Sequence, residues 1–252
     1  MTDAVGHGPV GIGVVTPYDF ALDAELWRWL PPAVTLHLTR TPYLEVPVTV
    51  EQAVLVGDTQ VVAQAARDVS TPEPGVVAYA CTSGSFVRGL AGERELVAAM
   101  LASGIPEAVT TSGALLEALG ALGARRVAIA TPYDETIGGL LATFLVEAGL
   151  EVTSFSHLGL DRRIWTVPAE VTRELVRSAV TGPCDAVFVS CTNLATYPLI
   201  PELERELGVP VLTANQVTMW AALRCAGLAA TGPGQRLITD PAASGAPSGV
   251  GG

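Results

Sequence analysis

The chain has 252 residues, of which 49% are hydrophobic and 15% are charged, and its net charge is −11. This composition supports a large buried core and excludes intrinsic disorder for most of the chain. No apolar run approaches the ~20 residues that span a bilayer, and the basic residues are scattered rather than clustered. We therefore expect neither a membrane nor a nucleic acid as a partner.

Apolar runs and helical patterns alternate along the chain, which favours βαβ units and parallel sheets. In chain order, the first part is predicted to form strand 11–15, helix 22–30, strand 34–38, helix 50–69, strand 76–80 and helix 93–102. The second part is predicted to form helix 114–122, strand 127–130, helix 137–148, strand 152–155, helix 169–180, strand 186–190, helix 200–207, strand 209–212 and helix 219–226. Residues 240–252, which are rich in Ala, Ser, Gly and Pro, are predicted to form a disordered tail.

Two landmarks occur twice, each directly after a predicted strand. The sequence Thr-Pro-Tyr-Asp stands at 16–19 and again at 131–134. A Cys-Thr pair begins at Cys81 and again at Cys191. The distance along the chain from the first landmark to the second is nearly the same in both copies, which indicates an internal repeat.

The repeat predicts an α/β fold of two pseudo-symmetric, doubly wound halves of the flavodoxin or Rossmann type, each with a parallel sheet. We expect these halves at 1–115 and 116–214, with a helix at 215–230 packing back on the first half. Ligands of parallel α/β sheets bind at the carboxyl ends of the strands. All four landmarks stand at such ends, so we expect the active site in the cleft between the halves.

Cys81 and Cys191 stand in matching contexts and are the candidate catalytic residues. Small residues follow Cys81, and N–H groups at the start of a following helix can hold a carboxylate and lower the pKa of a thiol. A single cysteine of this kind is more often a buried core residue, but the matched pair favours catalysis. Cys184 and Cys225 have no counterpart in the repeat, so we expect structural roles for them.

Two thiols across one cleft allow two reactions next to a carboxylate. One thiolate can remove a proton from carbon while the other thiol donates on the opposite face, which gives racemisation or epimerisation. Alternatively, one thiolate can add to an activated double bond while the other thiol supplies a proton, which gives cis–trans isomerisation. Both reactions need donors that stabilise developing negative charge.

Several polar residues close to the landmarks are candidates for binding the substrate. Those that stand beside the two thiols or in the second repeated turn are Thr82, Ser83, Tyr133, Thr192 and Asn193. Tyr18 occupies the matching turn of the first half. Arg40 follows a strand and can clamp a second carboxylate, with a solvated loop charge as the alternative. Asp19 and Asp134 are predicted to be helix N-caps.

The sequence offers no pattern for a metal or an organic cofactor. It has no CxxC pair, its histidines are dispersed, and it lacks a phosphate loop and a GxGxxG turn. Residues 1–10 lack a basic stretch and an apolar signal core, which predicts a cytoplasmic protein with free thiols. We expect a small carboxylate or dicarboxylate as the substrate, and the oligomeric state stays open, with a homo-oligomer as one option.

These features resemble the aspartate/glutamate racemase superfamily, and within it the branch of maleate cis–trans isomerase and arylmalonate decarboxylase. The resemblance runs from about residue 11 to 228 and rests on the repeated landmarks and on segment 81–89, where the decarboxylase has glycine in place of the first cysteine. Because both cysteines are present, the resemblance implies isomerase or racemase chemistry. It implies Cys81 as the nucleophile and Cys191 as the acid and base.

One departure concerns the first turn. The isomerase pattern has an asparagine there that holds a carboxylate, whereas residues 17–20 contain none. This puts maleate itself in question, and Arg40 or Asn193 would have to replace the contact. A racemase, including a related two-cysteine group of ectoine breakdown, a decarboxylase-like enzyme and a non-catalytic carboxylate-binding protein are the alternatives.

Overall fold

The computed structural model describes residues 10–240, so the predicted tail lies outside the described residues from 241 on. Within that range, the strands form two four-stranded parallel sheets in the orders β2-β1-β3-β4 and β6-β5-β7-β8. The first sheet contains β1 (Val10–Thr16), β2 (Val34–Arg40), β3 (Val76–Tyr79) and β4 (Ala108–Thr110). The second contains β5 (Arg126–Thr131), β6 (Glu151–His157), β7 (Ala186–Val189) and β8 (Val211–Thr213). The matching strand orders confirm the predicted α/β fold with two similar halves.

Helices alternate with the strands, as the periodicity predicts. Between residues 10 and 240 they are α1 (Asp23–Leu26), α2 (Val50–Val56), α3 (Thr59–Val69), α4 (Thr82–Phe86), α5 (Gly89–Ala102), α6 (Thr111–Ala121), α7 (Glu135–Glu147), α8 (Ala169–Ala179), α9 (Ile200–Leu207), α10 (Ala214–Cys225) and α11 (Arg236–Thr239). None of these helices is both long and apolar enough to cross a bilayer. The strands β3 and β7 are buried at every position, because packing covers both faces of each sheet.

Three expectations about the elements were wrong. The helix predicted over 50–69 is two helices, because Gly57 ends α2 and the Asp58 side chain then accepts hydrogen bonds from the first amides of α3. The helix predicted over 22–30 is shortened to α1, which continues as a 3₁₀ turn over Trp27–Trp29. The short strand β4 and the short helix α4 carry too few residues to show a period, and the sequence missed both.

A close approach of two glycines fixes the end of α2 against α4. A Cβ atom placed on Gly57 would lie 2.3 Å from the carbonyl oxygen of Gly84, so no larger residue fits there. Gly84 lies in α4, directly after the strand end that carries Cys81. The backbone of α2 therefore reaches the immediate surroundings of the first repeated cysteine.

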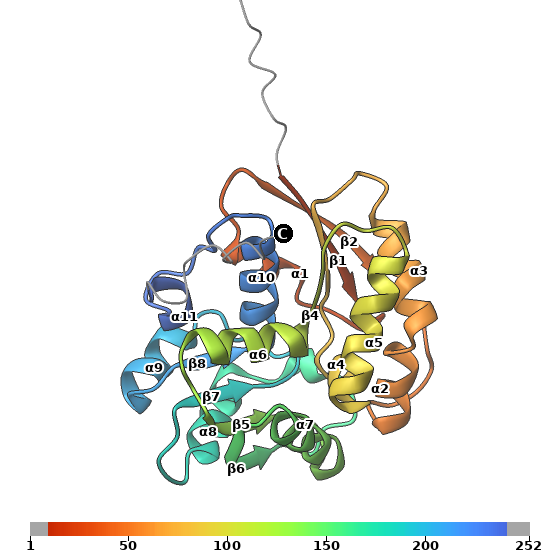
Figure 1. The fold of residues 1–252 in the computed structure, drawn as a ribbon. Helices are drawn as coiled ribbons and strands as arrows, with labels where there is room; N and C mark the ends of the chain where they lie inside the picture. The colour runs from red at the N-terminus through yellow and green to blue at the C-terminus, as the bar shows by residue number, and fades with distance from the viewer. Residues whose placement is uncertain (1–9, 241–252) are drawn as a thin grey trace, which may run out of the picture.

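The two halves share one continuous hydrophobic core, which includes Ile12 from β1 and Ile129 from β5. Figure 1 shows the elements of the first half in red to yellow and those of the second half in green to light blue, with α6 lying between the two groups. Helix α10 follows the second half in the chain but packs on α6 and on β3 of the first sheet. We propose a division between the halves within α6, near residue 115.

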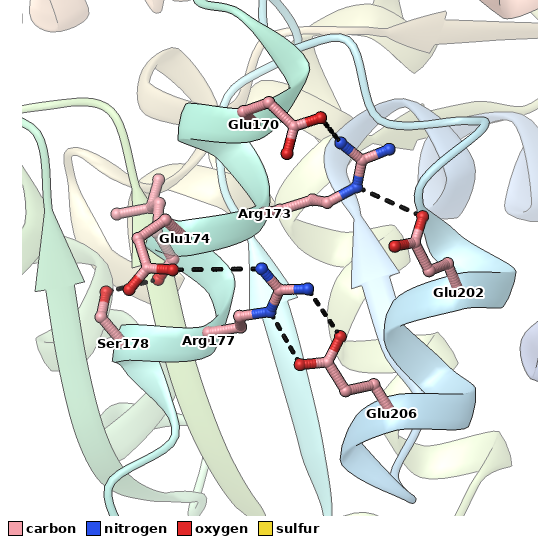
Figure 2. A network of polar contacts seen from close by, with 8 residues as sticks. Glu170, Arg173, Glu174, Arg177, Ser178, Glu202 and Glu206 are labelled. Carbon is pink, nitrogen blue, oxygen red and sulfur yellow. Dashed lines mark hydrogen bonds and ion pairs between the residues drawn. The ribbon is translucent and has the colours of Figure 1, made fainter.

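Ion pairs join α8 to α9 on the outside of the second half (Figure 2). Arg173 contacts Glu170 on its own helix and Glu202 on α9. Arg177 binds Glu206 through two hydrogen bonds of 2.7 and 2.9 Å. Exposed pairs of this kind contribute roughly 0–1 kcal/mol each. The network therefore connects α8 to α9 but contributes little to the free energy of unfolding.

Candidate active site

A small buried cavity lies between the carboxyl ends of the two sheets. Its volume is about 20 Å³, which is space for about one water molecule. It is lined by Pro17, Asp19, Val48, Gln52, Cys81, Ser83, Tyr133, Ile164, Cys191, Thr192 and Asn193. Both repeated cysteines thus face one cavity, from equivalent strand ends of the two halves. We refer to it as the thiol cavity.

Cys81 follows β3 and is the N-terminal cap residue of α4. Its side chain lies on the same face of the strand as Tyr79, because residues two apart in a strand point to the same side. The Tyr79 hydroxyl, the Ser83 side chain and the Gly84 amide are hydrogen-bonding partners of its sulfur. These partners lower the pKa of Cys81, but burial has the larger effect and raises it. The expected lowering of the thiol pKa was therefore wrong, since Cys81 as a residue is only 4% exposed.

Cys191 follows β7 and has a left-handed backbone conformation with φ of 88°. In this conformation the Asn193 amide donates a hydrogen bond to its sulfur over 3.4 Å. The Tyr133 hydroxyl is a second partner of the same sulfur. Burial outweighs both partners and raises the pKa of Cys191 to about 12, so this side chain is a thiol at neutral pH.

Tyr133 lines the thiol cavity and lies close enough to both thiols to interact with them. Its hydroxyl is hydrogen-bonded with Cys191 and with Ser83, which belongs to the other half. Burial and the proximity of both sulfurs raise the pKa of Tyr133 well above its ordinary value. The side chain therefore stays a neutral hydrogen-bond donor that faces the cavity at the boundary of the halves.

Three more of the predicted substrate-binding residues are near the thiols, with different roles. Thr192 and Asn193 line the thiol cavity, whereas Thr82 does not. The amide group of Asn193 is occupied, because its oxygen accepts from the Ala21 amide at 2.9 Å and its nitrogen donates to the Asp19 carbonyl at 3.2 Å. Asn193 therefore connects the first turn of one half to the second cysteine loop of the other.

Besides Thr82, two predicted binding residues do not line the thiol cavity. The Tyr18 hydroxyl points to the Val46 carbonyl, to which it donates at 3.2 Å. The Arg40 guanidinium binds the Asp23 carboxylate at 3.1 Å and the Phe20 carbonyl, which hold it outside the cavity. The expectation that Arg40 clamps a substrate carboxylate therefore has no support from its position.

Two polar lining residues were missed by the sequence analysis, besides the apolar Pro17, Val48 and Ile164. Asp19 was expected to be a helix N-cap, but α1 begins later and Asp19 faces the thiol cavity instead. Its counterpart Asp134 does cap a helix, since its carboxylate accepts from the Ile137 amide at 2.9 Å. Gln52 also lines the cavity. It stands four residues before the buried Val56, and a polar residue on that apolar helix face was the available signal.

A larger hollow adjoins the thiol cavity and shares Asp19 and Val48 with it. It has a volume of about 350 Å³ and lies between segments 43–48 and 161–165, one from each half. The Val48 amide joins these segments through a 2.7 Å hydrogen bond to the Asp161 carbonyl. The two short segments thus meet directly beside the thiol cavity, which Val48 and Ile164 also line.

The arrangement supplies two thiols, one neutral tyrosine donor and several hydroxyl groups around one small volume. Such a set can move a proton to or from carbon and can add a sulfur to an activated double bond. Within residues 10–240, no three His, Cys, Asp or Glu side chains form a cluster that could hold a metal. Cys184 and Cys225 do not line the thiol cavity, and Cys225 is exposed at the end of α10.

Comparisons with known proteins agree on one family. A family model described as arylmalonate decarboxylase matches residues 49–238. Arylmalonate decarboxylase from Bordetella bronchiseptica is 40% identical over 169 residues, which are 64% of this chain and 69% of that protein.

Two solved structures extend the similarity over the whole fold. A mutant of arylmalonate decarboxylase in the liganded form, with a glycine-to-cysteine and a cysteine-to-serine change, has a TM-score of 0.84 at 32% identity, covering 91% of this chain and 99% of that chain. A cysteine-to-serine mutant of Nocardia farcinica maleate cis-trans isomerase, with a covalently bound succinylcysteine intermediate, has a TM-score of 0.82 at 26% identity, covering 91% and 98%. The chain therefore belongs to the arylmalonate decarboxylase family, in the branch of the aspartate/glutamate racemase superfamily that also contains the maleate isomerases.

Proposed function

We propose that this protein is a cofactor-independent isomerase in which Cys81 and Cys191 act on carbon next to a carboxylate. The observation that carries this proposal is the convergence of the two repeated cysteines on one buried cavity, with Tyr133 close to both. A binding protein has no need of two matched thiols in its cavity, and the relatives named above are enzymes.

The leading reaction is thiolate addition and protonation, as in a maleate cis–trans isomerase. The Cys81 thiolate forms a C–S bond to one carbon of an activated cis double bond. The electron pair moves toward the carboxylate, and the Cys191 thiol protonates the neighbouring carbon. The new single bond rotates, the Cys191 thiolate then removes that proton, and the C–S bond breaks as the trans double bond forms. Both cysteines return to their starting states.

The surroundings of the two sulfurs support these separate roles. Cys81 has the Tyr79 and Ser83 side chains and the Gly84 amide to stabilise a thiolate. Cys191, with a pKa of about 12, holds its proton at neutral pH and is suited to donate it. The succinylcysteine intermediate of the Nocardia farcinica enzyme is an adduct of the kind that this mechanism requires.

Racemisation is the second candidate, and the matched positions of the thiols favour it. In that reaction one thiolate removes the proton on carbon, and the other thiol returns a proton to the opposite face. The similarity to arylmalonate decarboxylase also allows loss of CO₂, but a cysteine at position 81 supplies a second acid and base that one-cysteine decarboxylation does not use.

Proton NMR in D₂O with a panel of maleate, an arylmalonate and 2-amino and 2-aryl acids distinguishes these reactions. Isomerisation gives the trans alkene, racemisation gives deuterium at Cα in both enantiomers, and decarboxylation gives a deuterated monoacid. We expect isomerisation or racemisation to require both Cys81 and Cys191. If the panel yields only decarboxylation, or if the Cys81→Ala variant turns over at the wild-type rate, the proposal is wrong.

A further inference from the structure

Two hydrogen-bond acceptors face the thiol cavity without a role in the chemistry proposed above. Asp19 belongs to the first repeated turn, and Gln52 belongs to the first turn of α2. Both line the same small volume as Cys81 and Cys191. The counterpart of Asp19 in the second half, Asp134, caps α7 instead.

The orientation of the Gln52 amide group follows from its neighbour Tyr18. The Tyr18 hydroxyl gives its one proton to the Val46 carbonyl, so its oxygen accepts from the Gln52 amide nitrogen with which it is hydrogen-bonded. The Gln52 Oε1 atom is left with no hydrogen-bond partner among the described residues, although the residue is only 4% exposed. An unsatisfied buried acceptor of this kind costs roughly 1–3 kcal/mol.

Asp19 makes the cavity negative. Of the lining residues, Asp19 alone carries a charged side chain, and none of the arginines of residues 10–240 lines the cavity. Burial raises the pKa of Asp19, while its backbone hydrogen bond and the charge of Arg40 lower it to a smaller extent. The Arg40 guanidinium itself binds Asp23 and the Phe20 carbonyl. The charge of Asp19 also raises the pKa of both thiols, so it works against a thiolate in the same cavity.

We propose that Asp19 and Gln52 bind the ammonium group of the substrate, which is an amino acid rather than a dicarboxylate. The inference rests on the proposed function of the two thiols and favours its second candidate, racemisation, because a saturated amino acid has no double bond to which a thiolate could add. An ammonium group offers three N–H donors and one positive charge, which match the Asp19 carboxylate and the unpartnered Gln52 Oε1 atom. The substrate carboxylate is then left to the hydroxyl groups of Tyr133, Ser83 and Thr192, which line the same cavity.

The charge balance favours this substrate class. A dicarboxylate would bring two negative charges into a buried space that already holds Asp19 and, during the reaction, a thiolate. An amino acid is neutral overall, and its ammonium group compensates Asp19 where the low dielectric makes the attraction strong. The ion pair also removes the negative charge that opposes ionisation of the thiols.

The test measures binding without turnover. Iodoacetamide alkylation of Cys81, followed by peptide mass spectrometry, reports whether a ligand occupies the cavity. The probes are racemic 2-aminobutanoate and butanoate, which share a carbon skeleton and differ in the ammonium group, with maleate as the dianion. We expect 2-aminobutanoate to protect Cys81 at concentrations at least about tenfold lower than either other probe. Equal protection by 2-aminobutanoate and butanoate, or stronger protection by maleate, would overturn the inference.

Variants locate the effect. Asp19→Asn should remove most of the preference for 2-aminobutanoate, and Gln52→Met should weaken it several-fold. Asp134→Asn is the matched control, because asparagine is an equally good N-cap and this residue does not line the cavity. Retention of the full preference in both Asp19→Asn and Gln52→Met would refute the assignment. Because protection requires no turnover, it can succeed while the two-cysteine chemistry fails, and the two outcomes are distinguishable.

Discussion

The Tyr79 hydroxyl is hydrogen-bonded with the sulfur of Cys81, two residues further along the chain. The same hydroxyl donates to the Val56 carbonyl at the end of α2 over 2.7 Å. Gly84 makes room for this arrangement, since a Cβ atom there would lie 2.3 Å from the hydroxyl and 3.1 Å from the sulfur. The corresponding residue of β7 is Val189, so the second half has no such contact.

We predict that Tyr79→Phe makes Cys81 a weaker thiolate. When Cys81 ionises, the one proton of the Tyr79 hydroxyl turns from the Val56 carbonyl to the sulfur, and this lowers the pKa of Cys81. Phenylalanine keeps the ring but removes that donor. The pH profile of iodoacetamide alkylation at Cys81 should therefore move to higher pH. Peptide mass spectrometry measures the rate at Cys81 separately from the rates at the other cysteines.

The Tyr133→Phe variant is the control for this experiment, because Tyr133 is hydrogen-bonded with Cys191. It should shift the alkylation profile of Cys191 and leave that of Cys81 nearly unchanged. Tyr79→Phe also costs about 1 kcal/mol of stability, since the Val56 carbonyl loses its donor. Lost stability with an unmoved alkylation profile would show that Tyr79 has a structural role only.

Much of the fold follows from the repeat. The landmarks at Thr16 and Thr131 end the first strand of each sheet, and those at Cys81 and Cys191 directly follow β3 and β7. Parallel strands have their carboxyl ends at one edge of the sheet. Two copies of one pattern were therefore enough to predict that both thiols lie at one cleft.

The repeat failed where the two halves are packed differently. Tyr133 faces the thiols, whereas Tyr18 in the matching turn is turned to the Val46 carbonyl. Asp134 caps a helix, whereas Asp19 lines the cavity. Val46 lies 28 residues from Tyr18, and Ser83 and Cys191 lie still further from Tyr133. A local turn pattern carries no information about such distant partners.

The cysteine pair yields a second prediction. Cys81→Ala and Cys191→Ala should each abolish turnover, because both sulfurs line the cavity where the substrate carbon must lie. Cys184→Ala and Cys225→Ala should retain it, because neither residue lines that cavity. Steady-state rates of the four variants on the best substrate from the NMR panel test this. Comparable losses in all four variants would contradict the assignment.

A third prediction concerns stability at alkaline pH. The pKa of Cys191 rises from 9.0 to about 12 on folding, so above pH 9 the unfolded chain loses this proton more readily than the folded one. The contribution of Cys191 to the free energy of unfolding is therefore complete below pH 9. It is lost as the pH rises toward 12, by at most about 1.4 kcal/mol per pH unit. The free energy of unfolding in urea should fall less steeply above pH 9 in Cys191→Ser. Parallel curves for the variant and the wild type would disprove this.

The backbone of Cys191 provides the last prediction. A φ of 88° is the left-handed region, which costs roughly 1–2 kcal/mol for any residue with a Cβ atom. The free energy of unfolding of Cys191→Gly, measured in urea, should therefore exceed that of Cys191→Ala by about 1 kcal/mol. Neither variant is expected to turn over substrate. Cys184 is the matched control, because it is not among the residues with positive φ. Cys184→Gly should be less stable than Cys184→Ala, because glycine relieves no strain there and only increases the conformational entropy of the unfolded chain. If alanine were more stable than glycine at both positions, the prediction would be wrong. The loop after β7 would then relax freely in the variants, and the left-handed backbone at Cys191 would store no strain.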